Sequence, residues 1–116
     1  MGILETIAII MLVVQFAHSG EELLTGFHRR WYLTKLPFSY FLAFEILHNL
    51  FWTAVILLNY FPLRIYLLGS FVVLMFANGI QHLVWAGMVK KYVPGLITAP
   101  VHVILFLVLY FLMLRT

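Results

Sequence analysis

The chain has 116 residues, of which 65% are hydrophobic and 9% are charged, and its formal net charge is +3. A soluble domain of this size cannot bury so large an apolar fraction, so the composition excludes a soluble globular protein and indicates one integral membrane domain over residues 1–116. The seven Lys and Arg residues are spread over several loops, which excludes a nucleic-acid surface, and the absence of cysteine excludes disulfides and thiolate metal ligands.

Four apolar segments have the length of about 20 residues that a membrane-spanning helix needs. They predict an all-α polytopic membrane protein, built as an antiparallel bundle of four transmembrane helices. Glycine, proline and short basic loops separate the segments, which cover about residues 3–24, 37–60, 63–89 and 94–114. Pro100 lies inside the fourth segment, where it predicts either a kink or a freed backbone carbonyl near the polar residues.

The basic residues predict the orientation of these spans. Five of the seven fall in the first and third loops, and only Arg64 and Arg115 fall on the opposite side. The five loop residues are Arg29, Arg30, Lys35, Lys90 and Lys91. By the positive-inside rule, the first and third loops are expected to face the cytoplasm. The chain is expected to cross the cytoplasmic membrane several times, with both termini on its outer side.

Each predicted span carries a stripe of polar side chains at helical spacing, about 12 Å from the cytoplasmic boundary. The stripes comprise Gln15, His18, Ser19 and Glu22; Glu45, His48, Asn49 and Trp52; Asn78, Gln81, His82 and Trp85; and Thr98 and His102, with Glu21 at the edge of the first. A charge at the bilayer centre costs about 2.5–3.5 kcal/mol, so acidic residues there need partners and mark function. The shared depth predicts one inward-facing site.

The residue types in this layer are those of a metal site. The first two spans run antiparallel, so His18-x-x-Glu21 and Glu45-x-x-His48 point the same way in space, and Glu-x-x-His is the pair used in di-iron carboxylate bundles. Nitrogen and oxygen ligands suit Zn, Fe or Mn. The predicted metal ligands are His18, Glu21, Glu22, Glu45, His48, His82 and His102. They are too many for one ion and enough for two.

These ligands predict a metal-dependent membrane enzyme, either hydrolytic or oxidative. Its predicted catalytic residues are Glu21, Glu22 and Asn78, with Glu21 or Glu22 as the general base toward water or O₂ activated by the metal. Asn78 and Thr98, one turn from His82 and His102, are expected to orient those imidazoles. A site about 12 Å deep is reached more readily from lipid than from water, which indicates a lipid or membrane-dissolved substrate. Four short helices give limited enclosure, which also allows a homodimer.

Three segments carry a resemblance to a known family. His18-Ser19-Gly20-Glu21-Glu22 resembles the signature of the HXXEE family of small bacterial and archaeal membrane proteins. The segment from Asn78 to His82 resembles the second motif of that family, and the segment from Pro94 to Thr98 resembles a third. The family is described as membrane enzymes without an assigned substrate, so the resemblance implies a site but no reaction.

A second resemblance offers a different mechanism. Glu21-Glu22 and the segment from Phe44 to His48 are similar to motifs of the intramembrane CAAX-type proteases, in which Glu and His activate water without a metal. Gly26 stands where those proteases carry Arg, and the order of Asn78 and His82 is reversed. This alternative keeps the polar layer as the active site and removes the metal.

Two further alternatives are not enzymes. An ion or proton transporter would need a continuous polar path, and the outer halves of the spans offer only Glu5, Asn59 and Ser70. A haem-binding protein would use histidines as axial ligands and would leave three buried glutamates without a role.

Overall fold

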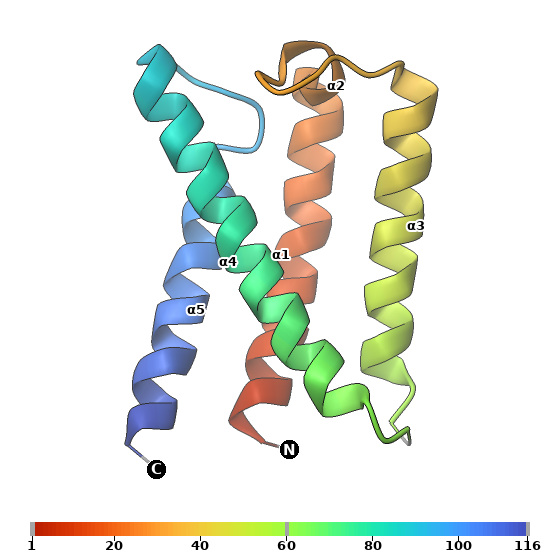
Figure 1. Cartoon of the computed structure of the whole chain (residues 1–116), viewed down its shortest axis with the longest axis vertical. Coiled ribbons are helices and arrows are strands. Elements are labelled where there is room, and N and C mark those ends of the chain that lie inside the picture. Colours follow the sequence, from red (N-terminus) through yellow and green to blue (C-terminus); the bar gives the residue numbers. More distant parts are fainter. Residues whose placement is uncertain (1, 60, 116) are drawn as a thin grey trace.

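The computed structural model describes residues 2–59 and 61–115, and within those residues it is helical, without strands (Figure 1). The helices are α1 (Ile3–Thr25), α2 (Phe27–Arg30), α3 (Phe38–Leu57), α4 (Arg64–Val89) and α5 (Ala99–Leu114). Three of them, α1, α3 and α4, are long and apolar enough to cross a membrane, while α5 is a shorter apolar helix of 16 residues.

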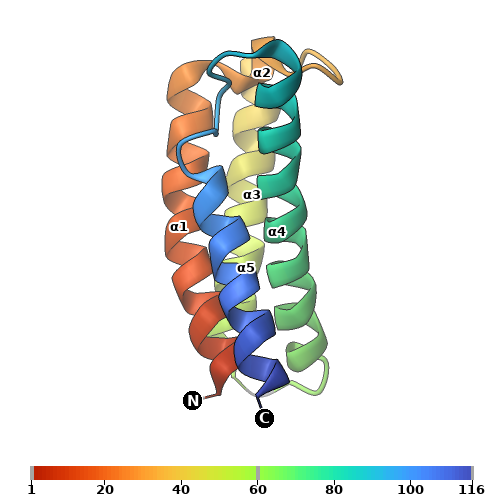
Figure 2. The ribbon, with the colours of Figure 1, turned by 90° about the vertical axis from the view of Figure 1, so that its left-hand side faces the viewer.

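Helix α1 lies at the centre of the packing, since it contacts α3, α4 and α5. The two ends of the chain lie at the same end of the molecule, and the long helices run along its long axis (Figures 1 and 2). Helices α4 and α5 approach closely at Gly79, where an added Cβ would lie 2.7 Å from the carbonyl oxygen of Ala99. This glycine therefore brings the start of α5 against the middle of α4.

The first three predicted spans correspond to α1, α3 and α4. The first and third agree with the helices to within one residue at each end. The second was expected to reach Tyr60, which lies outside the described residues, and α3 already ends at Leu57. Gly26, at φ +79°, ends α1 in the left-handed conformation that favours glycine, and the chain then forms the short helix α2, which was not predicted.

The fourth span was expected to be helical from its start, and that expectation is wrong. The span was expected to begin near residue 94, whereas the chain from Pro94 to Thr98 forms turns and α5 begins at Ala99. The kink predicted at Pro100 is also wrong, because this residue lies in the first turn of α5. A proline there breaks no helical hydrogen bond, since the first backbone N–H groups of a helix have no partner within it.

Two apolar clusters enclose a polar layer. The first cluster includes Ile7, Ala8, Met11 and Leu12 of α1 and Leu68, Phe71, Val72 and Met75 of α4. Phe27 and Trp85, at the other end of the molecule, belong to the second. The buried polar residues between them are Gln15, His18, Ser19, Glu22, Glu45, His82 and His102. The fold therefore places the polar layer between two apolar layers.

Arg64 joins three helices at the end of the molecule away from α2. Its guanidinium donates to the carbonyl oxygens of Val55 and Ile56, at 3.1 and 2.7 Å, and to Oε1 of Glu5 at 3.0 Å. The two carbonyl groups belong to the last turn of α3, where no further helical N–H is available to them. Arg64, at the start of α4, therefore caps α3 and ties it to α1.

Candidate metal centre

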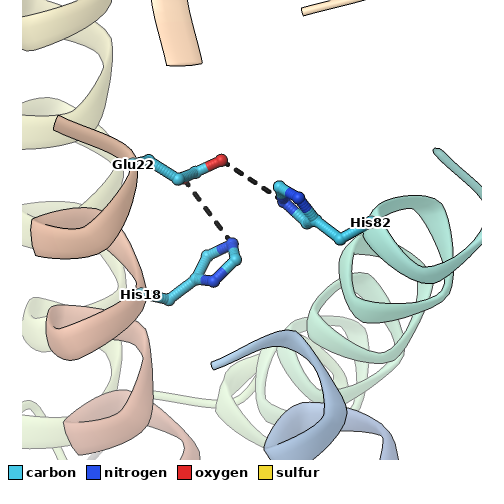
Figure 3. Close-up of side chains that lie close together, drawn as sticks. All are labelled: His18, Glu22 and His82. Carbon is cyan, nitrogen blue, oxygen red and sulfur yellow. Dashed lines mark ion pairs between the residues drawn. The ribbon is translucent and has the colours of Figure 1, made fainter. Parts of the chain in front are cut away.

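Three buried side chains from α1 and α4 converge at one point. His18 and Glu22 lie one turn apart on α1, and His82 faces them from α4 (Figure 3). Glu22 places Oε1 3.6 Å from Nε2 of His18 and Oε2 3.3 Å from Nε2 of His82. One ligand atom from each residue lies within 4.8 Å of the other two, and this is the one group of its kind found in the described residues.

These distances suit a single ion. Nitrogen and oxygen ligands lie about 2.0–2.2 Å from zinc, which separates two ligands of a tetrahedral ion by roughly 3–4 Å. The two contacts of Glu22 fall in that range. The structure therefore brings together three of the seven predicted ligands in a geometry that could hold a metal.

Thr98 orients the ring of His18. The hydroxyl of Thr98 lies 2.6 Å from Nδ1 of His18 and donates to Oε1 of Glu21 at 2.7 Å. A hydroxyl has one hydrogen to donate, so Nδ1 of His18 carries the proton and donates to Thr98. The lone pair of the ring then lies on Nε2, the nitrogen that faces Glu22, and Asn78 Nδ2 lies 3.0 Å from the same nitrogen.

Asn78 and Thr98 thus act on a different imidazole from the one expected. They were predicted to orient His82 and His102, yet both contact His18. Thr98 lies in the turn before α5, where its backbone N–H and hydroxyl both bind Glu21 of α1. Helical spacing alone pairs Thr98 with His102 and does not register that turn.

The ring of His82 is buried without a hydrogen bond of normal geometry at either nitrogen in the part of the chain described. The carbonyl of Pro94 lies close enough to interact with the ring electrostatically. Gly95, at φ +93°, covers this ring and that of His18: an added Cβ would lie 2.5 Å from Cε1 of His82 and 2.8 Å from Cε1 of His18. What places this ring in the group of three is its Nε2, which lies 3.3 Å from Oε2 of Glu22.

His102 and Glu45 lie beside the group of three. The ring of His102 is centred 5.5 Å from that of His18, and its Nε2 lies 3.3 Å from Oε1 of Gln15. Glu45 accepts a hydrogen bond of 2.5 Å from the hydroxyl of Ser19. Its carboxyl group also interacts with that of Glu22. Both residues are in the polar layer, and neither belongs to the group of three.

His48 lies farther out on α3. Its Nε2 accepts a hydrogen bond of 3.1 Å from the indole of Trp52, and its ring stacks on Phe44. Its Nδ1 is buried without a hydrogen bond to any of the described residues, but neither ring nitrogen belongs to the group of three converging ligand atoms. The structure therefore separates His48 from the three converging ligands, although its depth and helical face matched theirs.

Glu21 is saturated by the turn before α5. Its carboxylate accepts hydrogen bonds from the backbone N–H groups of Gly95, Ile97 and Thr98, at 3.0–3.1 Å. The hydroxyls of Thr98 and Tyr92 add two more, at 2.7 and 2.5 Å. Burial and the hydrogen bond to Glu21 raise the pKa of Tyr92. Glu21 thus binds the N-terminal end of α5 from another helix, as a capping residue does within one.

Sequence reasoning missed two residues of this site, Tyr92 and Gly95. The dipeptide Pro94-Gly95 was interpreted as the start of a helix, whereas a proline followed by glycine is also a turn signal. That signal was available in the sequence. The contact with Glu21 was not, because it joins residues more than 70 positions apart.

A cavity of about 400 Å³ lies against the polar layer, between α1, α3 and α4. Glu22 and Glu45 are both in its wall, so the candidate metal group borders on the cavity. The complete lining is Gln15, Glu22, Phe27, Trp31, Leu36, Phe41, Phe44, Glu45, His48, Leu74, Met75, Asn78 and Gln81.

The chain matches one protein family over most of its length. The model of a family described as "Protein of unknown function with HXXEE motif" matches residues 9–111. The matched range contains every predicted metal ligand and all donors to Glu21. No curated protein and no solved structure matches the chain.

Proposed function

The chain belongs to the HXXEE-motif family, whose function is unknown, and we propose that it is a metal-dependent integral membrane enzyme with one ion held by His18, Glu22 and His82. The observation that carries this proposal is the convergence of three buried ligand atoms within 4.8 Å of one another. One ion is proposed because the described residues contain one such group.

The donor set supports a catalytic ion over a structural one. Structural zinc sites use four protein ligands, whereas catalytic zinc sites use three, often two His and one Glu, and keep a position open. Two His and one carboxylate also form the facial triad of Fe(II) oxygenases. The chain contains no cysteine, so the ligands are nitrogen and oxygen atoms, which suit Zn, Fe or Mn. When bound, such an ion would lower the pKa of water or activate O₂, which corresponds to the hydrolytic and oxidative alternatives.

The neighbouring side chains receive separate roles. Glu45, in the cavity wall and next to the carboxyl of Glu22, is the proposed proton acceptor. Glu21 positions His18 through Thr98 and takes no part in proton transfer, because its oxygens already accept five hydrogen bonds. Asn78 borders the cavity and the ring of His18, where it would hold a polar group of the substrate.

The proposed setting is the cytoplasmic membrane, which the chain crosses as a four-helix antiparallel bundle with both termini outside. α1, α3 and α4 have the length and hydropathy for this. Helix α5, with 16 residues, extends about 24 Å, less than the hydrocarbon core of about 30 Å. Residues 94–98 complete the crossing. Non-helical backbone is tolerated at membrane depth where protein satisfies its hydrogen bonds, as Glu21 does here.

The geometry does not support haem held between His18 and His82. The rings of His18 and His82 are centred 4.7 Å apart in an edge-to-face arrangement, and Gly95 closes the space beside them. No porphyrin plane fits between imidazoles at that separation.

The test is the metal content of the purified protein, measured by mass spectrometry in the wild type and two variants. We expect about one ion per chain, lost in His82→Ala and in Glu22→Gln, because each removes one of three ligands. His28→Ala is the matched control, since His28 lies in α2 outside the group. Wild-type protein that binds none of Zn, Fe and Mn, or variants that bind as much as the wild type, would overturn the proposal. The first result would favour the metal-free mechanism, with Glu22 and His82 acting on water.

A further inference from the structure

We infer that the cavity between α1, α3 and α4 binds a single-chain lipid whose head group donates hydrogen bonds and carries no negative charge, and that this lipid enters from the bilayer between α3 and α4. The inference names the substrate class of the proposed enzyme. It rests on the proposed function only in treating the bound lipid as the molecule on which the enzyme acts. Binding in the cavity is a property of its walls and can be measured without the metal.

The walls favour a hydrocarbon chain. A volume of about 400 Å³ lies in the range of small-molecule sites. More than half of the lining side chains are apolar or aromatic, and they come from α2, α3, α4 and the loop after α2. They are Phe27, Trp31, Leu36, Phe41, Phe44, Leu74 and Met75. Such walls bind an alkyl or prenyl chain through burial of apolar surface.

The polar side of the cavity selects the head group by charge. The lining contains two carboxyl groups, from Glu22 and Glu45, and neither Lys nor Arg. In the metal-free protein, a phosphate or carboxylate head group would therefore face two carboxyl groups with no Lys or Arg side chain to pair with. Carboxylate oxygens accept hydrogen bonds, so they favour a hydroxyl or an amide N–H on the ligand.

The cavity opens toward lipid between α3 and α4. Phe44 of α3 and Leu74 of α4 both line the cavity and yet remain 59% and 48% exposed, as residues at a mouth do. Figure 1 shows α4 diverging from α3 toward the end that carries α2, while the two helices stay joined at the other end through Arg64. A chain-like ligand can therefore enter sideways without crossing the polar layer.

Photolabelling of the full chain in nanodiscs tests the inference. The probes are a long-chain alcohol with a photoreactive group in its chain and the phosphate monoester of the same alcohol. In metal-free protein, we expect the alcohol to label α3 around Phe44 and α4 around Leu74, and the phosphate ester to compete about tenfold less well. Peptide mapping of the labelled wild-type protein locates the labelled residues without the need for a variant.

A pair of variants on α4 adds a second measurement. Leu74→Trp fills the mouth and should reduce labelling by the alcohol about tenfold. Val73→Trp is the matched control, since Val73 is the preceding residue, is 54% exposed and does not line the cavity. Equal labelling of the two variants, labelling spread over the outer helix surfaces, or equal competition by the phosphate ester would overturn the inference.

Metal content measured on the same samples separates this inference from the proposed function. Cavity labelling in protein that binds no metal would leave the lipid site standing and overturn the metal-dependent enzyme. Bound metal without cavity labelling would overturn the lipid site alone.

Discussion

The carboxylate of Glu21 binds Thr98 twice, through the backbone N–H at 3.0 Å and through the hydroxyl at 2.7 Å. The same hydroxyl lies 2.6 Å from Nδ1 of His18. Glu21 and Glu22, the two adjacent carboxylates of the motif, therefore have different roles. Glu21 acts on His18 through another helix, and Glu22 faces His18 and His82 directly.

The first prediction concerns the hydroxyl of Thr98. Thr98→Val keeps the shape of the side chain and removes the partner of His18, so the affinity for metal should fall about 10–100-fold, as it does when an outer partner of a ligand is lost. Competition with a chelator measures this. Thr98→Ser should restore the affinity. Thr53→Val, which removes a hydroxyl bound only to the backbone of its own helix, should not change it. Unchanged affinity in Thr98→Val would show that the hydroxyl does not hold the ring.

The second prediction separates the two carboxylates. Glu21→Gln places an amide NH₂ against backbone N–H donors and should lower the free energy of unfolding by about 1–3 kcal/mol. The metal stoichiometry at saturation should stay near that of the wild type. Glu22→Gln should abolish metal binding without a comparable loss of stability in the metal-free protein. Thermal unfolding in detergent, followed by Trp fluorescence, gives the stability of each. Metal loss of equal size in the two variants would refute the division of roles.

The third prediction concerns Gly95. Gly95→Ala should abolish metal binding, because the new Cβ would overlap the rings of His82 and His18 and because φ is +93° at this position. Gly87→Ala is the control. An added Cβ there meets no atom within 4 Å, and alanine stabilises a helix interior by up to about 1 kcal/mol over glycine. A Gly95→Ala protein that binds metal with wild-type affinity would exclude the close covering of the histidines by this turn.

The fourth prediction concerns the opposite end of the molecule. Arg64→Met leaves the carbonyl groups of Val55 and Ile56 and the carboxylate of Glu5 without their donor. The expected loss of stability is about 1–3 kcal/mol. Metal content should be unchanged, because the apolar cluster from Leu68 to Met75 separates Arg64 from the polar layer. Thermal unfolding and metal analysis of the same preparation check both statements, and a loss of metal at unchanged stability would contradict them.

Hydropathy was sufficient to locate α1, α3 and α4, because their apolar runs end at glycine, proline or charged residues. It failed between Pro94 and Thr98, where an apolar run is not helical. The backbone there is held by the carboxylate of Glu21, and a pattern of neighbouring residues contains no information on so distant a partner.

Depth and helical face identified a polar layer but could not say which of its members meet. His48 and His102 have the same spacing as the three converging residues, yet neither belongs to the group whose ligand atoms lie within 4.8 Å of one another. The outcome depends on the rotation of each helix and on the rotamer of each side chain. Neither quantity is encoded in a periodic pattern.

The contact between Glu21 and the turn before α5 has a consequence for how the protein is made. Its partners lie 71–77 positions later in the chain, so α1 is synthesised and inserted long before them. A nascent chain that ends before Pro94 already contains His18, Glu22 and His82, yet it lacks the hydroxyl that orients His18 and the glycine that covers the rings. The candidate site is therefore complete only after the chain has been synthesised as far as Thr98.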